Sequence, residues 1–577
     1  MNNKYTGEKN IQILISLLKK HNVKNIIASP GATNVSFVAS VQNDSFFNVI
    51  SCVDERSACY LACGMAAELN EPVVLTCTGA TASRNYIPGL TEAFYRKLPI
   101  IAITATQYTG RIGHNVPQVI DRSILLNDIV VKSIQLDLIH TLEDAWSCNI
   151  KVNEAILATN DYGGGPVHIN MVTDYSNDFP CTELPDERII KRYFINDQFP
   201  DISSKKIAIF VGNHLKMSNE LENSIDEFCE KYNAVVLCDH TSNYHGKYRI
   251  LGNLICAQSG NDELKNTELL IDIGNINGSY MEIKPKNVWR VNPDGVIRDR
   301  YKKLTKIFAM EEIEFFNKYN VLGKKNNTDA NYFKKWKSCY YSLNSKINMD
   351  KLPFSNIWIA NQIINKFEEN STIHLAILNT LRSWNFFEST KKLNVYCNTG
   401  GFGIDGIVSS AIGASLVKDS NVYCIVGDLA FFYDLNSIGN RNIKNNLKII
   451  LINNGCGTEF HNYNHRAAKI ASAGNLSSEY FAADGHYGNK SKELVKHYSQ
   501  DLGFMYMSAS NKEEFLCKVD KFVSDKNSSM IFEIFTNPEE ESNALKMIKN
   551  LDTSLKGVAM GILGDKGVEI VKKVIKK

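Results

Sequence analysis

The chain has 577 residues, too many for one hydrophobic core, so about three domains are expected. Hydrophobic residues make up 44% and charged residues 22% of the sequence, as in ordinary globular proteins. The 64 basic and 62 acidic residues nearly cancel, which argues against nucleic-acid binding. The N-terminus lacks the apolar run of a signal peptide, and no apolar stretch reaches the ~18 residues of a membrane span. We therefore expect a cytoplasmic protein that does not enter a membrane.

Strand and helix patterns alternate along most of the chain, which predicts an α/β fold. The expected architecture is three doubly wound parallel-sheet domains, at residues 1–180, 190–340 and 350–545, followed by a helical tail at 546–577. The first and third domains show a similar order of predicted strands and helices along the chain. They are therefore expected to be variations on one topology.

In the first domain, an apolar strand over residues 47–53 leads into a helix from about Glu55, with Asp54 as its N-cap. This helix is rich in small residues, which would let the helix pack closely against a partner subunit. Glu55 itself has two interpretations. It is either a first-turn acid favoured by the helix dipole, or a buried carboxyl group that takes part in catalysis.

In the third domain, Asp428 and Asn454 each follow an apolar strand. Ligands of open parallel sheets bind beyond the carboxyl ends of the strands, so this carboxylate and this amide oxygen should meet at one point. A hard divalent ion such as Mg²⁺ takes such oxygen ligands and shares its shell with phosphates. Gly427 would let the backbone approach an anion closely. The alternative is that Gly-Asp and Asn-Asn are ordinary turn residues.

The pair Gly-Asp at 427–428 and Asn-Asn at 453–454 resembles the signature of thiamine diphosphate-dependent enzymes, the superfamily of acetolactate synthase and pyruvate decarboxylase. Leu429 stands where that signature has its last glycine. In this departure the chain resembles the family of menaquinone-pathway succinyl-enolpyruvyl-hydroxycyclohexene-carboxylate synthases. The resemblance is specific near residues 29–105 and 395–457 and implies thiamine diphosphate and Mg²⁺ as cofactors.

The resemblance also implies roles for individual residues. The metal would be held by Asp428, the side chain of Asn454 and the backbone carbonyl of Cys456. Glu55 would be the proton-relay acid beside the pyrimidine ring, and Ile404 the bulky residue that bends the cofactor. The full set of cofactor-binding residues would be Glu55, Thr78, Gly79, Phe402 (through its carbonyl), Ile404, Gly427, Asp428, Leu429 and Asn454. For the glycine-rich part of this set, a plain turn is the alternative.

Further residues are candidates for proton transfer near the substrate. Gln118 matches the place where relatives put a glutamine facing the reaction centre, and His114 is either a proton shuttle or a loop histidine. Three more titratable residues closely follow the second half of the signature: Glu459, His461 and His465. One of the three is a further candidate for proton transfer.

The substrate is less well indicated. The synthase family carries arginines that bind substrate carboxylates at two places where this chain has Thr33 and Thr399. The leading interpretation is therefore an acetolactate-synthase-like decarboxylase or carboligase, with pyruvate as the default 2-oxo acid donor and a carbonyl compound as acceptor. One alternative is a menaquinone-type synthase that uses 2-oxoglutarate and isochorismate. Another is a catalytically silent cofactor-binding subunit, against which the presence of Glu55 argues.

The superfamily places its active sites between subunits, so the resemblance implies a homodimer or homotetramer in which Glu55 of one subunit meets Asp428 of another. In the central domain, residues 211–214 lack a full Gly-x-Gly-x-x-Gly sequence. Bound FAD is therefore not supported.

Overall fold

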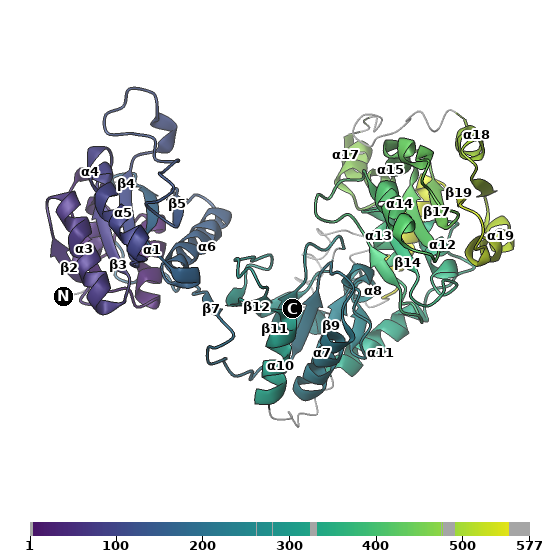
Figure 1. The fold of residues 1–577 in the computed structure, drawn as a ribbon, viewed down its shortest axis with the longest axis horizontal. Helices are drawn as coiled ribbons and strands as arrows, with labels where there is room; N and C mark the ends of the chain where they lie inside the picture. The colour runs from purple at the N-terminus through teal and green to yellow at the C-terminus, as the bar shows by residue number, and fades with distance from the viewer. Residues whose placement is uncertain are drawn as a thin grey trace, which may run out of the picture. The chain divides into compact units, whose positions relative to one another are not determined.

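A computed structural model describes residues 4–260, 262–279, 281–323, 332–474, 476 and 491–552. The chain divides into two compact units, Met1–Tyr193 with Gly295–Ile307 and Phe194–Asp294 with Phe308–Lys577. Three parallel sheets with helices packed on them confirm the predicted α/β class (Figure 1). Within the described residues, no helix is long and apolar enough to cross a membrane. Most of the predicted tail, residues 553–577, lies outside the described part.

The first sheet has the strand order β2-β1-β3-β4-β6-β5, with all strands parallel. Its inner strands β3, β4 and β6 are buried along their whole length. Near-continuous runs of Val, Ile, Leu and Ala are expected of strands that helices cover on both faces. The strands are β1 (Asn25–Ala28), β2 (Asn48–Ser51), β3 (Val73–Cys77), β4 (Ile100–Thr106), β5 (Lys132–Leu136) and β6 (Val167–Val172).

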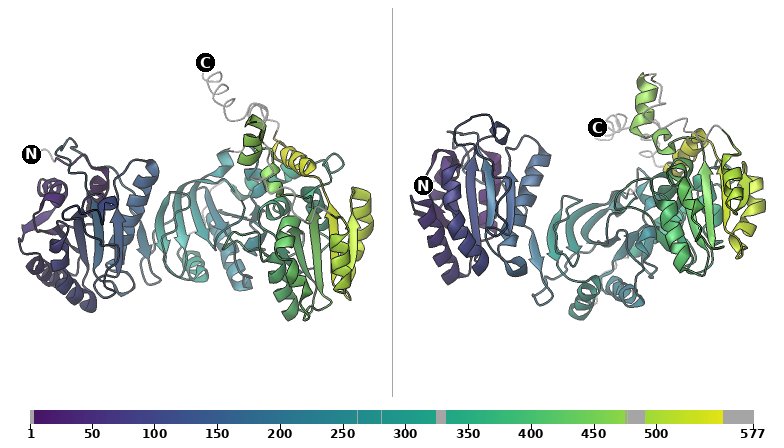
Figure 2. Two further views of the ribbon diagram at one scale, coloured as in Figure 1. Left: turned by 90° about the horizontal axis from the view of Figure 1, so that it is seen from above. Right: turned by 45° about the horizontal axis from the view of Figure 1, so that its top comes forward.

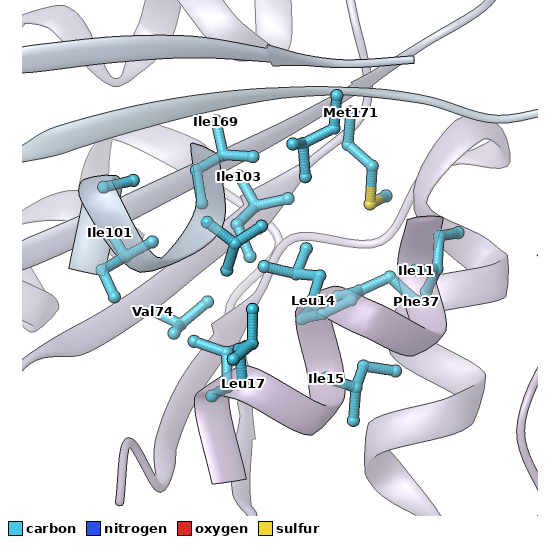
Figure 3. Packing of buried hydrophobic residues seen from close by; sticks show 14 of the residues in the cluster. Ile11, Leu14, Ile15, Leu17, Phe37, Val74, Ile101, Ile103, Ile169 and Met171 are labelled. Carbon is cyan, nitrogen blue, oxygen red and sulfur yellow. The ribbon is translucent and has the colours of Figure 1, made fainter. Parts of the chain in front are cut away.

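Two hydrophobic clusters form on the two faces of this sheet. Because strand side chains alternate, Val74 packs into the cluster that contains α1 and α6, while Leu75 packs into the cluster that contains α3 and α5. Figure 3 shows Leu14 and Leu17 of the first cluster close to Val74. The helices are α1 (Lys9–Lys20), α2 (Val35–Gln42), α3 (Glu55–Leu69), α4 (Thr81–Asn85), α5 (Ile87–Arg96) and α6 (Leu142–Ala158), with 3-10 turns η1 (Ala32–Asn34), η2 (Thr109–Arg111) and η3 (Asp161–Gly163).

Several small residues of α3 are buried within their own chain. Ala58, Cys59 and Ala62 pack in the second cluster with α5 and β3. A Cβ on Gly89 of α5 would lie 2.5 Å from the sulfur of Cys59, so the two helices approach closely. Gly64 and Ala67 of the same helix remain exposed, so packing of α3 against a partner subunit stays a prediction.

The second sheet has the order β10-β9-β8-β11-β12-β13-β7. A Cβ on Gly212, just after β8, would overlap the carbonyl oxygen of Asn275, so close approach of two strand ends accounts for this glycine. The strands are β7 (Lys191–Tyr193), β8 (Ile207–Val211), β9 (Val235–Cys238), β10 (Arg249–Leu251), β11 (Asn266–Ile273), β12 (Lys284–Val291) and β13 (Leu304–Phe308). The helices are α7 (Asn219–Tyr232), η4 (His240–Ser242), α8 (Asn253–Cys256), α9 (Asp262–Lys265), α10 (Glu312–Leu322) and α11 (Tyr332–Asn344).

The third sheet repeats the topology of the first. Its order, β15-β14-β16-β17-β19-β18, becomes identical to that of the first sheet when the strands are numbered from the start of each sheet. This confirms the predicted relation between the two domains. In both sheets the chain reverses its direction of winding between the first and third strands, so the carboxyl ends of β1 and β3, and of β14 and β16, flank the expected ligand crevice.

Views from two further directions show the helices that cover the third sheet (Figure 2). Its strands are β14 (Thr372–Leu375), β15 (Asn394–Tyr396), β16 (Val422–Gly427), β17 (Leu447–Asn453), β18 (Met505–Ala509) and β19 (Met530–Phe535). The helices are α12 (Asn356–Ile363), α13 (Asn379–Trp384), α14 (Ile407–Val417), α15 (Asp428–Tyr433), η5 (Leu435–Gly439), α16 (Thr458–His461), α17 (Arg466–Gly474), α18 (Leu494–Asp501), α19 (Lys512–Ser524) and α20 (Pro538–Lys549).

Candidate active site

In the first unit, Glu55 opens α3 but does not cap it. The cap is Asp54, whose carboxylate accepts hydrogen bonds from the backbone N–H groups of Arg56 at 3.0 Å and Ser57 at 3.4 Å. Glu55 is half-buried, and its Oε2 accepts a hydrogen bond from Nδ2 of Asn85 at 3.3 Å. Asp54 is thus the N-cap, as predicted, and Glu55 stands in the first turn of the helix, where the helix dipole favours an acid.

The loop after β3 is held in an unusual backbone conformation. A Cβ on Gly79 would lie 3.1 Å from the carbonyl oxygen of Gln118, and Ala80 has φ 56° and ψ −131°, which few residues with a side chain adopt. The hydroxyl of Thr78 shares a 2.6 Å hydrogen bond with that of Thr33. The fold thus brings two predicted site residues, Gly79 and Gln118, together.

The structure does not assign His114 a role in this part of the site. Its side chain is exposed, and its backbone N–H donates to the carbonyl of Arg111 at 3.2 Å within a turn after η2. Gln118 is also exposed and has a positive φ of 63°. Both residues lie in the long loop between β4 and β5, which Figure 1 shows beyond the end of β4.

In the second unit, Asp428 joins the ends of two strands. It is 2% exposed, its Oδ1 accepts the N–H of Leu429 at 2.8 Å, and its Oδ2 accepts the N–H of Gly455 at 2.6 Å. The two asparagines that follow β17 have different surroundings. Asn453 is buried and donates from Nδ2 to Glu533 at 2.7 Å, whereas Asn454 is half-buried at the strand end. Asn454 is therefore the more accessible of the two, and its Oδ1 accepts a 3.9 Å hydrogen bond from the Cys456 thiol.

The predicted metal ligands fit an ion that shares its shell with a diphosphate. Within the part of the chain that the structure describes, no group of three or more His, Cys, Asp or Glu residues could hold a metal. The predicted set has one carboxylate, on Asp428, one amide oxygen and the carbonyl of Cys456, which accepts a hydrogen bond from Thr458 N at 2.9 Å. Such a set would complete the shell of Mg²⁺ only with phosphate or water oxygens.

The glycine-rich segment before α14 leaves room beside this position. A Cβ on Gly400, Gly401 or Gly427 would meet no heavy atom within 4 Å. Phe402 is 40% exposed with a φ of 57°, and Ile404 packs partly against the core cluster of the third sheet. A backbone with open space beside its glycines and a supported apolar side chain fits the predicted cofactor contacts.

A cavity of about 650 Å³ lies at the same edge of the third sheet. It is lined by Arg382 of α13, which follows β14, and by Glu459 of α16, and these two side chains form an ion pair. His465 also lines it, and His465 Nδ1 accepts the N–H of Ala467 at 3.1 Å, which leaves Nε2 to carry the proton. His461 is not among the lining residues.

Two cationic residues of this cavity were not predicted from the sequence. Arg382 stands seven residues after the end of β14, and recognition of that short strand would have placed it at the carboxyl edge. Lys549, at the end of α20, also lines the cavity, and burial lowers the pKa of its ammonium group. No local sequence signal marks Lys549, because its position depends on how α20 packs.

Comparison with known proteins agrees with this geometry. Residues 9–125 match the thiamine pyrophosphate enzyme N-terminal TPP binding domain, and residues 379–530 match the corresponding C-terminal TPP binding domain. A 2-succinyl-5-enolpyruvyl-6-hydroxy-3-cyclohexene-1-carboxylate synthase of Phocaeicola vulgatus is 30% identical over 563 residues, covering 94% of this chain and 98% of the relative. The chain belongs to the thiamine pyrophosphate enzyme family.

Other relatives carry the same name. The Bacteroides thetaiotaomicron synthase is 28% identical with the same coverage, and the Flavobacterium johnsoniae synthase is 29% identical, covering 93% of this chain and 97% of the relative. The two matched domains of this thiamine pyrophosphate enzyme contain the residues described above. Glu55, Thr78, Gly79 and Gln118 lie in the N-terminal one, and Arg382, Asp428 and Asn454 in the C-terminal one.

Proposed function

We propose that this enzyme removes carbon dioxide from a dicarboxylic 2-oxo acid and joins the remaining acyl group to an acceptor. The observation that carries the proposal is the cavity lined by Arg382 at the carboxyl edge of the third sheet, the same edge as Asp428 and Asn454. Its charged lining has three cationic side chains, Arg382, Arg466 and Lys549, against the carboxylates of Glu282 and Glu459. Such a lining favours an anionic ligand.

The names of the relatives support the same class of donor. A 2-succinyl group is the four-carbon acyl group left when a five-carbon dicarboxylic 2-oxo acid, 2-oxoglutarate, loses carbon dioxide. The proposed donor is therefore 2-oxoglutarate, as in the synthase-type alternative, and not pyruvate. The guanidinium of Arg382 would bind the carboxylate that stays on the donor, since guanidinium and carboxylate groups match in geometry and charge.

When bound, thiamine diphosphate supplies the nucleophilic carbon that adds to the 2-oxo group. Asp428, Asn454 and the Cys456 carbonyl would hold its diphosphate through Mg²⁺, and Ile404 would support its bend. Glu55 would hold a proton at the pyrimidine ring, with Asn85 orienting its carboxyl group at 3.3 Å. The site as a whole would position the acceptor and exclude water from the reaction.

The acceptor differs, in this proposal, from that of the menaquinone-type synthases. Thr33 is 2% exposed and its hydroxyl bonds to Thr78 and to the carbonyl of Ala105 at 3.2 Å. Thr399 is 4% exposed and accepts a hydrogen bond from Asn213 at 2.9 Å. Neither side chain can replace a carboxylate-binding arginine. This observation favours, as the second candidate, a carboligase that uses pyruvate and an uncharged carbonyl acceptor.

We also propose a homodimer or homotetramer in which the two halves of the site come from different subunits. Supporting features are the large apolar side chains that α3 and the preceding residue Val53 expose. Val53 is 76% exposed, Tyr60 47%, Leu61 49% and Leu69 46%. Contact with another copy would cover this surface and make Glu55 less accessible to water.

The test is incubation of the protein with thiamine diphosphate, Mg²⁺ and single 2-oxo acids, with carbon dioxide release as the readout. Release from 2-oxoglutarate that exceeds release from pyruvate supports the proposal. Release from pyruvate alone supports the second candidate. No release from any donor, with cofactor binding intact, would mean a catalytically silent subunit.

A further inference from the structure

Arg122 is a buried cation in the first unit with most of its hydrogen-bonding capacity unused. It lies in the loop after β4 and is 4% exposed. Its Nη2 donates to Oδ1 of Asn170 at 2.7 Å and to the carbonyl of Ala105 at 3.4 Å. Among the described residues, Nε and Nη1 have no hydrogen-bond partner. These two nitrogens carry three of the five N–H groups of a guanidinium.

The surroundings of Arg122 do not supply an opposite charge. No carboxylate forms an ion pair with it in the described part of the chain, and the neighbouring charged side chain is another cation, Arg84. Burial lowers the pKa of Arg122 to about 10, and burial together with this guanidinium lowers the pKa of His168 to about 3. The imidazole is thus neutral at physiological pH. A buried cation without an anion is costly, so its retention needs a partner outside the chain.

The position of Arg122 connects it with the candidate site. Its Nη1 is 3.5 Å from the point that a Cβ on Gly79 would occupy, and the carbonyl oxygen of Gln118 is 3.1 Å from the same point. Thr33 donates to the carbonyl of Ala105, the oxygen that Nη2 of Arg122 also contacts. Arg122 therefore lies where the loops after β1, β3 and β4 meet, at the carboxyl edge of the first sheet.

The loop that carries Arg122 has exposed residues on both sides of it. Gln118, Asp121 and Ser123 of this loop are exposed, and a contact that ties it to the rest of the unit is the 3.0 Å hydrogen bond from Arg84 to the Asp121 carbonyl. Because Nε and Nη1 are enclosed, a carboxylate would reach them only if this loop, which has no strand or α-helix between β4 and β5, is displaced.

We infer that Arg122 is a substrate-binding residue that takes a carboxylate of the substrate on its unpartnered N–H groups. The inference rests on the proposed function, because it concerns the same site and the same class of substrate. It adds a second anion-binding position, on the first sheet, to the Arg382 cavity on the third. The carboxylate neutralises the buried guanidinium when it binds.

The experiment measures binding in the cofactor-loaded Glu55→Gln protein, in which turnover is blocked. The probes are 2-oxoglutarate, succinate and inorganic phosphate, titrated at low ionic strength by calorimetry. In this background, Arg122→Gln is expected to weaken carboxylate binding by at least about 30-fold, and Arg122→Lys by less, since lysine keeps the charge. The matched control, Arg96→Gln, removes an exposed arginine at the end of α5 in the same unit and is expected to change the affinity by no more than about threefold.

Three results would overturn the inference. One is unchanged carboxylate affinity in an Arg122→Gln protein whose circular dichroism and thermal unfolding match those of the parent. Another is a result in which Arg122→Gln weakens the binding of phosphate but not the binding of carboxylates. The third is no oxyanion binding that depends on Arg122. Failure of the proposed function is a separate observation, the absence of carbon dioxide release in the enzyme that keeps Glu55.

Discussion

Replacement of Asp428 by asparagine tests the metal half of the site. The buried carboxylate accepts two backbone N–H groups, from Leu429 at 2.8 Å and from Gly455 at 2.6 Å. An asparagine has one acceptor oxygen, so its amide NH₂ would face one of these donors. A buried donor left without an acceptor costs about 1–3 kcal/mol. The substitution also removes the one carboxylate of the predicted metal ligands.

The unpaired donor lowers the stability of the fold, whereas loss of the metal ligand should weaken Mg²⁺-dependent cofactor binding by about 3 kcal/mol, roughly 150-fold in Kd. At a cofactor concentration of 100 times the original Kd, ligand binding stabilises the folded protein by about 2.7 kcal/mol. By the same relation the Asp428→Asn protein would keep about 0.3 kcal/mol of this stabilisation. Unfolding followed with and without thiamine diphosphate and Mg²⁺ measures the difference.

Asp525→Asn is the matched control. Asp525 also accepts two backbone N–H groups, from Asn527 at 3.0 Å and Ser528 at 2.9 Å, but it lies beside Lys448 near the start of β17, at the opposite end from Asn454. Its replacement is expected to lower stability and leave the cofactor-induced increase unchanged. Retention of the full increase by Asp428→Asn would refute the assignment of Asp428 to the metal site.

Glu55→Gln should keep cofactor affinity within about threefold and lower turnover at least about 100-fold, because the amide cannot exchange a proton; titration and carbon dioxide release measure the two effects. Burial raises the pKa of Glu541 from 4.5 to about 7, so the folded chain binds this proton more tightly than the unfolded chain does. The stability from this group is fully present below about pH 4.5 and is lost as the pH rises through 7, a loss of about 3 kcal/mol. In the parent protein the midpoint temperature of unfolding should fall between pH 5 and 8, and Glu541→Gln should make this fall smaller. A fall of the same size in the variant would count against the raised pKa of Glu541. Leu61→Glu should lower the molecular mass seen by sedimentation and also lower turnover, because Leu61 is 49% exposed on α3; a variant that keeps both would argue against an interface on this helix.

The sequence predicted the positions of Asp428 and Asn454 in the fold better than that of Arg382. Asp428 and Asn454 follow strands made of apolar runs, so their place at the carboxyl edge could be inferred from the strand pattern. Strand β14 was missed because it has four residues and includes His374, and strand β18 because its side chains are mostly half-buried. Without β14, nothing in the sequence placed Arg382 at this edge.

Arg122 illustrates a second limit on what the sequence alone can predict about the substrate-binding residues. It stands 43 residues after Gly79 in sequence, in a loop with no periodic pattern, and only the folded loop brings its Nη1 beside that glycine. A search for arginine at fixed positions such as Thr33 cannot find a guanidinium that a different loop supplies. The inference about Arg122 therefore concerns a segment that comparison at Thr33 and Thr399 alone does not examine.

The shared strand order of the first and third sheets explains why these two limits occur together. Equivalent strand ends provide the same kind of crevice in both sheets, and short turns at those ends carry Gly79 and Asp428. The longer segments between the strands carry Arg122 and Arg382, and their paths follow packing that no local pattern encodes. If both arginines bind substrate carboxylates, single replacements should each weaken the binding of a dicarboxylic donor or its acceptor. The double replacement should then leave pyruvate, which has no second carboxylate, the least affected of the 2-oxo acids.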